Sequence, residues 1–130
     1  MTQWADRLDK PTLIVGDFNI APLESDVWSH KQLLKVVSHT PIEVEKFGRM
    51  QASLDWVDAV RHFIPPEEKL FTWWSYRSPD WTKNNRGRRL DHIWGTKPLK
   101  SARKAHKSMA ETRDWQQPSD HVPVMVEMKI

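Results

Sequence analysis

The feature that most constrains this chain is an apolar run that stops abruptly at a carboxylate. Thr12–Gly16 is short, apolar and rich in β-branched residues, and Asp17-Phe18-Asn19 follows at once. A run of this length between proline and glycine predicts a buried strand rather than a helix. Side chains two residues apart on an extended chain lean the same way. We therefore expect Asp17 and Asn19 to be presented together at the end of this strand.

Acidic residues and histidines also stand beside two later predicted strands, Leu90–Trp94 and Val122–Met128. These residues are Asp91, His92, Asp120 and His121. In open α/β sheets, groups at strand ends often line a ligand site because the strand is a rigid base. Each motif alone is equally consistent with a turn, a cap or a surface ion pair. The three motifs together favour a single site.

The remaining patterns indicate an α/β fold in a single domain over residues 1–130, a length typical of one domain. Amphipathic stretches predict helices over Val27–Val37 and, after Pro41, over Ile42–Trp56. Aromatic residues and threonine over Phe71–Tyr76 predict a further strand. Helices thus separate the strands in the first half, and strands follow one another in the second.

Composition narrows the functional classes. The chain has no cysteine, which excludes disulfides and thiolate metal sites. No segment resembles a signal peptide or a membrane span, so we expect a soluble, intracellular protein of the cytoplasm, without a membrane partner. The net charge of +3 is compatible with a polyanionic partner. Eight tryptophans can pack a core, stack on bases or wall a sugar pocket.

One segment combines aromatic and basic residues, FTWWSYR (71–77) followed by KNNRGRR (83–89). Side chains alternate faces on a strand, so Trp73 and Trp74 are expected to point in opposite directions, one packing and one lining a cleft. The basic loop is most simply a solvated loop. Beside exposed aromatics it also offers the positive charge and amide donors that a phosphate backbone requires.

Four motifs in this order, GDFNIAP, FTWWSYR, NNRGRRLDHIW and PSDHVPV, resemble the C-terminal half of bacterial exonuclease III. That enzyme family belongs to the endonuclease/exonuclease/phosphatase superfamily and includes apurinic/apyrimidinic endonucleases. The resemblance implies a deoxyribonuclease I-like fold, of which this chain forms half of a four-layer α/β sandwich. That half is one mixed β-sheet with helices on its outer face. The N-terminal half, with the glutamate that binds the principal metal, would be absent.

The resemblance also implies roles in hydrolysing the DNA backbone at abasic sites and from duplex 3′ ends. Asp17 would orient or deprotonate the attacking water, and Asn19 would hydrogen-bond the scissile phosphate or hold Asp17. His121 would stabilise charge on the phosphate, and Asp91 would hold His121 through its other ring nitrogen. Asp120 would lie near a divalent ion, Mg²⁺ or Mn²⁺.

Further residues would bind the substrate. Trp73 and Leu90 would wall the pocket for a flipped-out abasic sugar, and Arg77, Asn85 and Arg86 would touch duplex DNA. The inner face of the sheet would be uncovered and apolar, so we expect it to pair with the missing half or with a second copy. Nuclease activity of the chain alone is expected to be weak or absent.

Two alternatives remain open at this point. One is a non-catalytic module that keeps the basic loop and the aromatic pocket and binds only nucleic acid or a partner protein. The other is a phosphatase or lipid phosphodiesterase of the same superfamily. Those enzymes share the GDxN and SDH motifs, but they lack the aromatic strand and the Asn-Arg-Gly loop.

Overall fold

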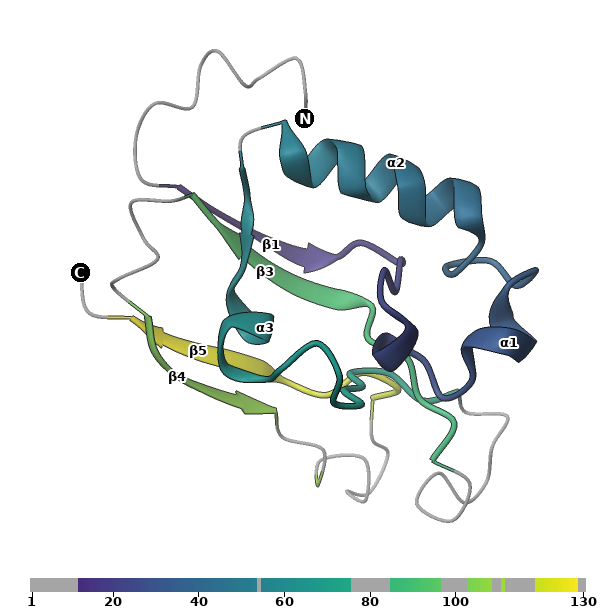
Figure 1. Ribbon diagram of the computed structural model, residues 1–130. Helices are drawn as coiled ribbons and strands as arrows, with labels where there is room; N and C mark the ends of the chain where they lie inside the picture. Colours follow the sequence, from purple (N-terminus) through teal and green to yellow (C-terminus); the bar gives the residue numbers. More distant parts are fainter. Residues whose placement is uncertain are drawn as a thin grey trace.

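Two small antiparallel sheets and three α-helices make up the computed structural model, which describes residues 12–53, 55–75, 85–96, 103–108, 111 and 119–128. The first sheet has the order β1-β3-β2, from Leu13–Asp17, Asp91–Gly95 and Val57–Asp58. The second pairs β4 (Arg103–Ser108) with β5 (Val124–Met128). Figure 1 shows β1 and β3 running together between the long helix α2 and the β4–β5 pair. None of the described helices is long and apolar enough to cross a membrane.

The pairing of β1 with β3 brings two acidic residues face to face. The strands are antiparallel, and Asp17 at the end of β1 stands opposite Asp91 at the start of β3. Along the same ladder Val15 stands opposite Ile93. Because side chains alternate between the faces of a strand, these four residues share one face of the sheet. The carboxylates therefore lie at one end of an apolar strip.

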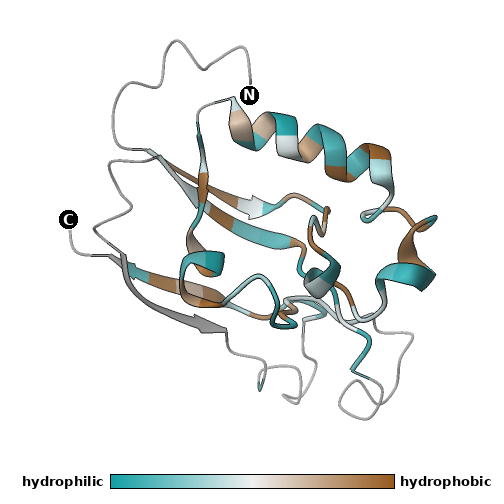
Figure 2. Ribbon diagram, viewed as in Figure 1, coloured by the Kyte–Doolittle hydropathy of each residue, from teal (hydrophilic) through white to brown (hydrophobic). Residues whose placement is uncertain are grey.

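The opposite face of β1 and β3 is covered by α2 (Pro41–Ala52). Phe47 of α2 packs with Trp94 of β3 and Trp56 in one buried cluster, to which Ile14 of β1 adds. Hydrophobic and hydrophilic residues alternate along α2, as expected of a helix with one face toward a core (Figure 2). This helix leaves the face that carries the carboxylates free.

The structure differs from the sequence expectations in three elements. The predicted single mixed sheet is found as two sheets, and every described strand pair is antiparallel. The helix predicted over Val27–Val37 is reduced to α1 (His30–Leu33), preceded by the 3-10 turn η2 (Glu24–Asp26). Within Phe71–Tyr76, Tyr76 lies outside the described residues. The described part forms no strand: Trp73 makes isolated bridges to Arg88 and His121, and Thr72 and Trp74 add backbone hydrogen bonds.

A buried ion cluster joins η2 to α3 (Ala59–Phe63) and to the segment before β3. The Asp26 carboxylate is fully buried, and Arg61 and Arg89 lie 2.6 and 2.7 Å from its Oδ1. Arg89 also lies 2.8 Å from Asp58 Oδ2. Two acids and two arginines balance in charge, which is the condition for burying them. Nothing in the sequence patterns predicted this cluster.

Gly87, in the loop before β3, packs so closely against a neighbouring side chain that there is no room for a Cβ atom. A Cβ at this position would lie 2.6 Å from Cβ and Cγ of Phe71, a buried aromatic. We expect Gly87→Ala to lower the free energy of unfolding by about 1–3 kcal/mol, because the core must shift to admit the methyl group. Denaturant unfolding measures this effect.

Gly48 provides the matched control for that substitution. It lies within α2, and outside the backbone of this helix no atom lies within 4 Å of the place that an added methyl group would take. Gly48→Ala is expected to raise stability by about 0.5–1 kcal/mol through helix propensity. Equal effects of the two substitutions would contradict the packing argument at Gly87.

Glu43 makes the stability of the α2 N-terminus depend on pH. Its carboxylate accepts hydrogen bonds from the Thr40 hydroxyl at 2.6 Å and from the Ser38 N–H at 2.9 Å. Burial alone would raise the pKa of Glu43, but these hydrogen bonds and the nearby His39 outweigh it and hold the pKa below its ordinary value of 4.5. The carboxylate therefore stabilises the fold above that value, and this stabilisation is lost as the pH falls below it.

Comparison with Glu43→Gln tests this dependence. The difference in unfolding free energy between the wild type and the variant is expected to be largest near neutral pH and to shrink below pH 4.5, the ordinary value. Chemical denaturation at a series of pH values measures it. A difference that does not change with pH would show that the charge of Glu43 plays no part in the cap.

Candidate active site

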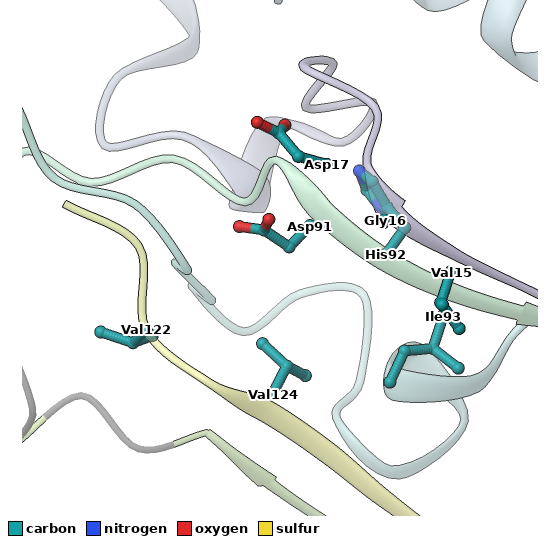
Figure 3. A pocket seen from close by; sticks show the side chains of 8 residues that line it. All are labelled: Val15, Gly16, Asp17, Asp91, His92, Ile93, Val122 and Val124. Atoms are coloured by element: carbon teal, nitrogen blue, oxygen red, sulfur yellow. The ribbon is translucent and has the colours of Figure 1, made fainter. Parts of the chain in front are cut away.

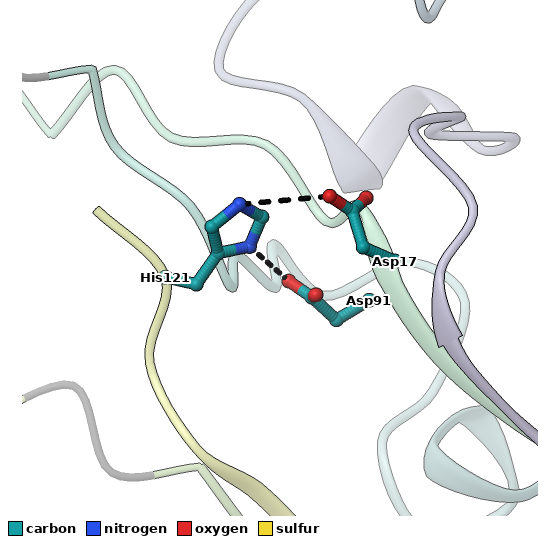
Figure 4. Close-up of side chains that lie close together, drawn as sticks. All are labelled: Asp17, Asp91 and His121. Carbon is teal, nitrogen blue, oxygen red and sulfur yellow. Dashed lines mark hydrogen bonds and ion pairs between the residues drawn. The ribbon is translucent and has the colours of Figure 1, made fainter. Parts of the chain in front are cut away.

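Three side chains from separate parts of the chain converge at the end of the β1–β3 ladder. Asp17 ends β1, Asp91 begins β3, and His121 lies shortly before β5, and each offers an oxygen or nitrogen atom within 4.8 Å of the others. Figure 4 shows the imidazole facing both carboxylates, with one ring nitrogen directed toward each. Nδ1 of His121 lies 2.8 Å from Asp91 Oδ2, and Nε2 lies 3.6 Å from Asp17 Oδ2.

The protonation of His121 follows from its partners. An ionised carboxylate can only accept a hydrogen bond, so Nδ1 of His121 donates to Asp91. The same oxygen of Asp91 accepts from the Thr72 hydroxyl at 2.7 Å, which fixes the carboxylate. In the neutral imidazole, Nε2 is then an acceptor directed toward Asp17. In the protonated form, Nε2 can donate a hydrogen bond to an anion. This orienting arrangement is the one found between the acid and the histidine of catalytic triads.

The loop that leaves β1 brings Asn19 back toward Asp17. The Asn19 N–H donates to Asp17 Oδ1 at 2.9 Å. Asn19 has a φ of 56°, in the left-handed region, which asparagine tolerates better than most residues. Both residues are exposed, so the loop presents them to solvent. Because this contact is made by the backbone of Asn19, which is not extended, the expectation that the two side chains lean the same way stays a prediction.

Asp120 lies beside this group but is not one of the three. Its Oδ2 accepts from the indole N–H of Trp73 at 3.0 Å, and its Oδ1 lies 4.0 Å from Nε2 of His121. Trp73 is half-buried, whereas its neighbour Trp74 is buried and donates to the Asn85 side chain at 3.1 Å. The two tryptophans thus differ in burial, and the prediction that one of them lines a cleft stays a prediction.

The other predicted substrate-binding residues are spread around this region. Leu90 is 3% exposed and packs in the core with Ala21, so it presents almost no surface for contact. Asn85 and Arg86 are exposed, and the Arg86 guanidinium lies 4.7 Å over the Trp28 ring. Arg77 lies outside the described residues. The roles assigned to these residues remain predictions.

A cavity of about 320 Å³ opens beside the three converging side chains. Figure 3 shows Asp17 and Asp91 at one end and the apolar side chains along the rest of it. Those side chains are Val15, Ile93, Val122 and Val124. Val15 is 61% exposed, and Leu13 on the same face of β1 is 44% exposed. The acidic end thus adjoins an uncovered apolar surface.

Comparison with known proteins places the chain in a family. The profile of the Endonuclease/Exonuclease/phosphatase family matches residues 2–121, most of the sequence. The chain belongs to this family. The resemblance found in the sequence motifs is thereby confirmed.

Two curated relatives are bacterial nucleases. Exodeoxyribonuclease III of Haemophilus influenzae is 31% identical over 125 residues, which cover 92% of this chain and 46% of that enzyme. Exodeoxyribonuclease of Bacillus subtilis is 31% identical over 115 residues, covering 88% of this chain and 43% of that enzyme. The chain therefore spans less than half the length of these two relatives.

Solved structures of the family confirm the predicted α/β fold class of the deoxyribonuclease I type. An AP endonuclease from Archaeoglobus fulgidus superposes with a TM-score of 0.87 at 26% identity, covering 99% of this chain and 53% of that one. The 3′ phosphatase NExo from Neisseria, bound to a product DNA hairpin, gives a TM-score of 0.89 at 27% identity. That match covers 99% of this chain and 50% of NExo.

The donor set of this family member fits a hard divalent cation at its carboxylates. Mg²⁺ and Mn²⁺ prefer oxygen ligands, which Asp17 and Asp91 supply. Nδ1 of His121 is engaged by Asp91, so only its Nε2 is free to act as a ligand. The predicted metal role of Asp120 remains a prediction.

Two further histidines near the site, His92 and His39, have positions that the sequence analysis did not foresee. His92 follows Asp91 in β3 and is 1% exposed. His39 is 3% exposed and precedes α2. Each lies 2.7 Å from a backbone carbonyl of the loop after β1. The only sequence signal was the position of His92 between Asp91 and Ile93 in a predicted strand. That position does not indicate which group the histidine binds.

Proposed function

We propose that this chain is the C-terminal half of a metal-dependent DNA-repair phosphodiesterase, with residues 1–130 as a single domain. The substrates would be duplex DNA with an abasic site and duplex 3′ ends. The observation that carries the proposal is the Asp91–His121–Asp17 arrangement, in which Nδ1 of the histidine is held at 2.8 Å while Nε2 faces a second carboxylate. The nuclease relatives of similar sequence support the reaction class.

Each residue has a defined part in the proposed hydrolysis. Asp17 orients the attacking water and takes its proton as the new bond to phosphorus forms. His121, oriented by Asp91, donates a hydrogen bond from Nε2 to a non-bridging oxygen of the phosphate as negative charge grows there. The ester oxygen leaves as the old bond breaks and takes up a proton from solvent. Asn19 lies beside Asp17 and contacts the phosphate.

A divalent cation, Mg²⁺ or Mn²⁺, would neutralise charge on the phosphate and the leaving oxygen when bound. Asp17 and Asp91 have the oxygen donors to hold it, and Asp120 is the further acid predicted for this role. The Arg86 guanidinium, exposed over Trp28, offers a contact to the DNA backbone.

The uncovered sheet face is proposed to receive the N-terminal half of the fold. Leu13 and Val15 are each more than 40% exposed, although β1 has the apolar composition of a core strand. The relatives are about twice as long as this chain, which leaves a segment of similar size to cover this face. An apolar surface of this kind favours association because its burial removes it from water.

Reconstitution tests the proposed function. The chain is mixed with the part of the Haemophilus influenzae enzyme that its match does not cover, and a duplex with one abasic site is added with Mg²⁺. We expect cleavage by the mixture and little or none by either part alone. Asp17→Asn in the mixture is the matched control, because it preserves shape and removes the charge.

The outcomes separate the alternatives. Rapid cleavage by the chain alone would show that no second half is needed. A stable complex that binds the duplex without cutting it would indicate a non-catalytic binding module. If the chain stays a soluble monomer at micromolar concentration and forms no complex with the added half, the proposal that the exposed face receives that half would be contradicted.

A further inference from the structure

Two buried histidines bind successive carbonyl groups of the loop after β1. Nε2 of His92 lies 2.7 Å from the carbonyl oxygen of Ile20, and Nδ1 of His39 lies 2.7 Å from that of Ala21. A carbonyl oxygen only accepts, so both nitrogens carry a proton. The side chains are 1% and 3% exposed, so neither donor can exchange its partner for water.

His92 has properties that keep it neutral. Burial and the nearby Arg89 guanidinium lower the pKa of His92. Its Nδ1 is buried and has no hydrogen-bond partner within the described part of the chain, so a second proton there would be unsatisfied. The ring also stacks against Phe18, with centroids 5.8 Å apart and planes 19° apart. His92 is therefore a fixed donor to the loop.

The loop needs such support because its conformation is costly. Asn19 has a φ of 56°, a region that non-glycine residues occupy at a cost and only when their surroundings hold them there. Phe18 before it donates to the Leu90 carbonyl at 3.0 Å, and Ala21 after it donates to that of Ser38 at 2.8 Å. The two imidazoles supply the hydrogen bonds to the loop carbonyls.

We propose that His92 and His39 are positioning residues, which hold the loop of residues 18–21 and thereby fix Asp17 and Asn19 at the active site. The effect on hydrolysis rests on the proposed function. The effect on the loop does not, because it concerns backbone order alone. His92 lies next to Asp91 in β3 but points to the opposite face of the strand. β3 therefore carries a residue of the active site on one face and a residue that contacts the loop on the other.

Paired amide substitutions test the contact at each histidine. A glutamine amide nitrogen reaches about as far as Nε2 and an asparagine amide nitrogen about as far as Nδ1. We therefore expect His92→Gln to keep the loop ordered and His92→Asn to release it. The order should reverse at position 39, where His39→Asn keeps the bond to Ala21 and His39→Gln does not. This second pair serves if a variant at position 92 does not fold.

Hydrogen exchange at the amides of Asn19 and Ala21 is the primary readout. In the releasing variants their exchange is expected to be about ten-fold faster, the factor that corresponds to losing one net hydrogen bond. Val60→Ala, a buried change in α3, is the control for general loss of stability. Equal exchange in His92→Asn and His92→Gln would overturn the proposal, and so would the same acceleration in Val60→Ala.

Kinetics of the reconstituted enzyme give the second readout. His92→Asn is expected to lower kcat about ten-fold with KM unchanged, and His92→Gln to restore it. If hydrogen exchange changes as expected but no form of the enzyme cleaves DNA, the wild type included, the proposed hydrolysis is wrong. The role of the two histidines in holding the loop would still be confirmed. A change in KM alone would contradict positioning of the reacting groups.

Discussion

Replacing His121 with glutamine is expected to slow DNA cleavage by the reconstituted enzyme by about 10²–10³-fold, the usual cost of removing one hydrogen-bond donor to the charge that develops in the transition state. Glutamine retains polarity and approximate length, but it cannot carry the positive charge that a protonated imidazole presents to the phosphate. Single-turnover rates measure the loss, with substrate affinity recorded separately. An effect below ten-fold, or a loss of binding alone, would contradict the assigned role.

Asp91→Asn extends this prediction to the residue that orients His121. Nδ1 of His121 lies 2.8 Å from Asp91 Oδ2 in the wild type. In the variant it would meet an amide that can donate as well as accept, so the imidazole of His121 would lose its fixed tautomer. Each single variant is expected to lose a similar factor, and the double variant little more, because the pair acts as a unit. Multiplicative losses would show that Asp91 and His121 act independently.

The second large effect is expected in the core, at Asp26. Its carboxylate is fully buried and lies within 2.7 Å of both Arg61 and Arg89. In Asp26→Asn, two guanidinium groups remain with Asp58 as the only acid of the cluster. We expect a loss of about 3–5 kcal/mol in the free energy of unfolding, as for other buried pairs that lose one partner. Denaturant titration measures this loss.

Glu45→Gln is the surface counterpart for this comparison. Glu45 lies 2.6 Å from Arg49 in α2, but both side chains are more than half exposed. Removing this charge is expected to cost only about 0.3–0.5 kcal/mol. If the two substitutions cost the same, the buried cluster would not be the major electrostatic support of the fold.

Local sequence patterns predicted the part of the site that local structure determines. The end of β1 and the position of Asp17 and Asn19 follow from an apolar run bounded by proline and glycine. The grouping of Asp17 with Asp91 and His121 could be inferred from the three strand-end motifs taken together and from the resemblance to a family. The antiparallel pairing that sets Asp17 opposite Asp91 is not visible in either local pattern. Periodicity identifies a strand without identifying its neighbour.

Long-range polar contacts were beyond prediction. Asp26 finds its partners at positions 61 and 89, and no repeat or spacing in the chain marks that cluster. The helix predicted over Val27–Val37 begins only at His30 because the backbone of Val27 and Trp28 pairs elsewhere: Val27 bridges to Arg88, and the Trp28 N–H donates to the Gly87 carbonyl. The described part of the aromatic segment after Phe71 likewise forms isolated bridges at Trp73 instead of a strand. Tertiary contacts override local propensity in these segments.

The convergence of Asp17, Asp91 and His121 is tested most directly by the imidazole ¹⁵N spectrum of His121 in the unmodified chain. We predict that, at neutral pH, Nδ1 bears a proton with the strong downfield shift of a hydrogen bond to a carboxylate. That signal should be lost in Asp91→Asn, and the ¹⁵N chemical shift of Nε2 should change in Asp17→Asn. A His121 protonated only on Nε2, with a spectrum indifferent to both substitutions, would contradict the existence of the site.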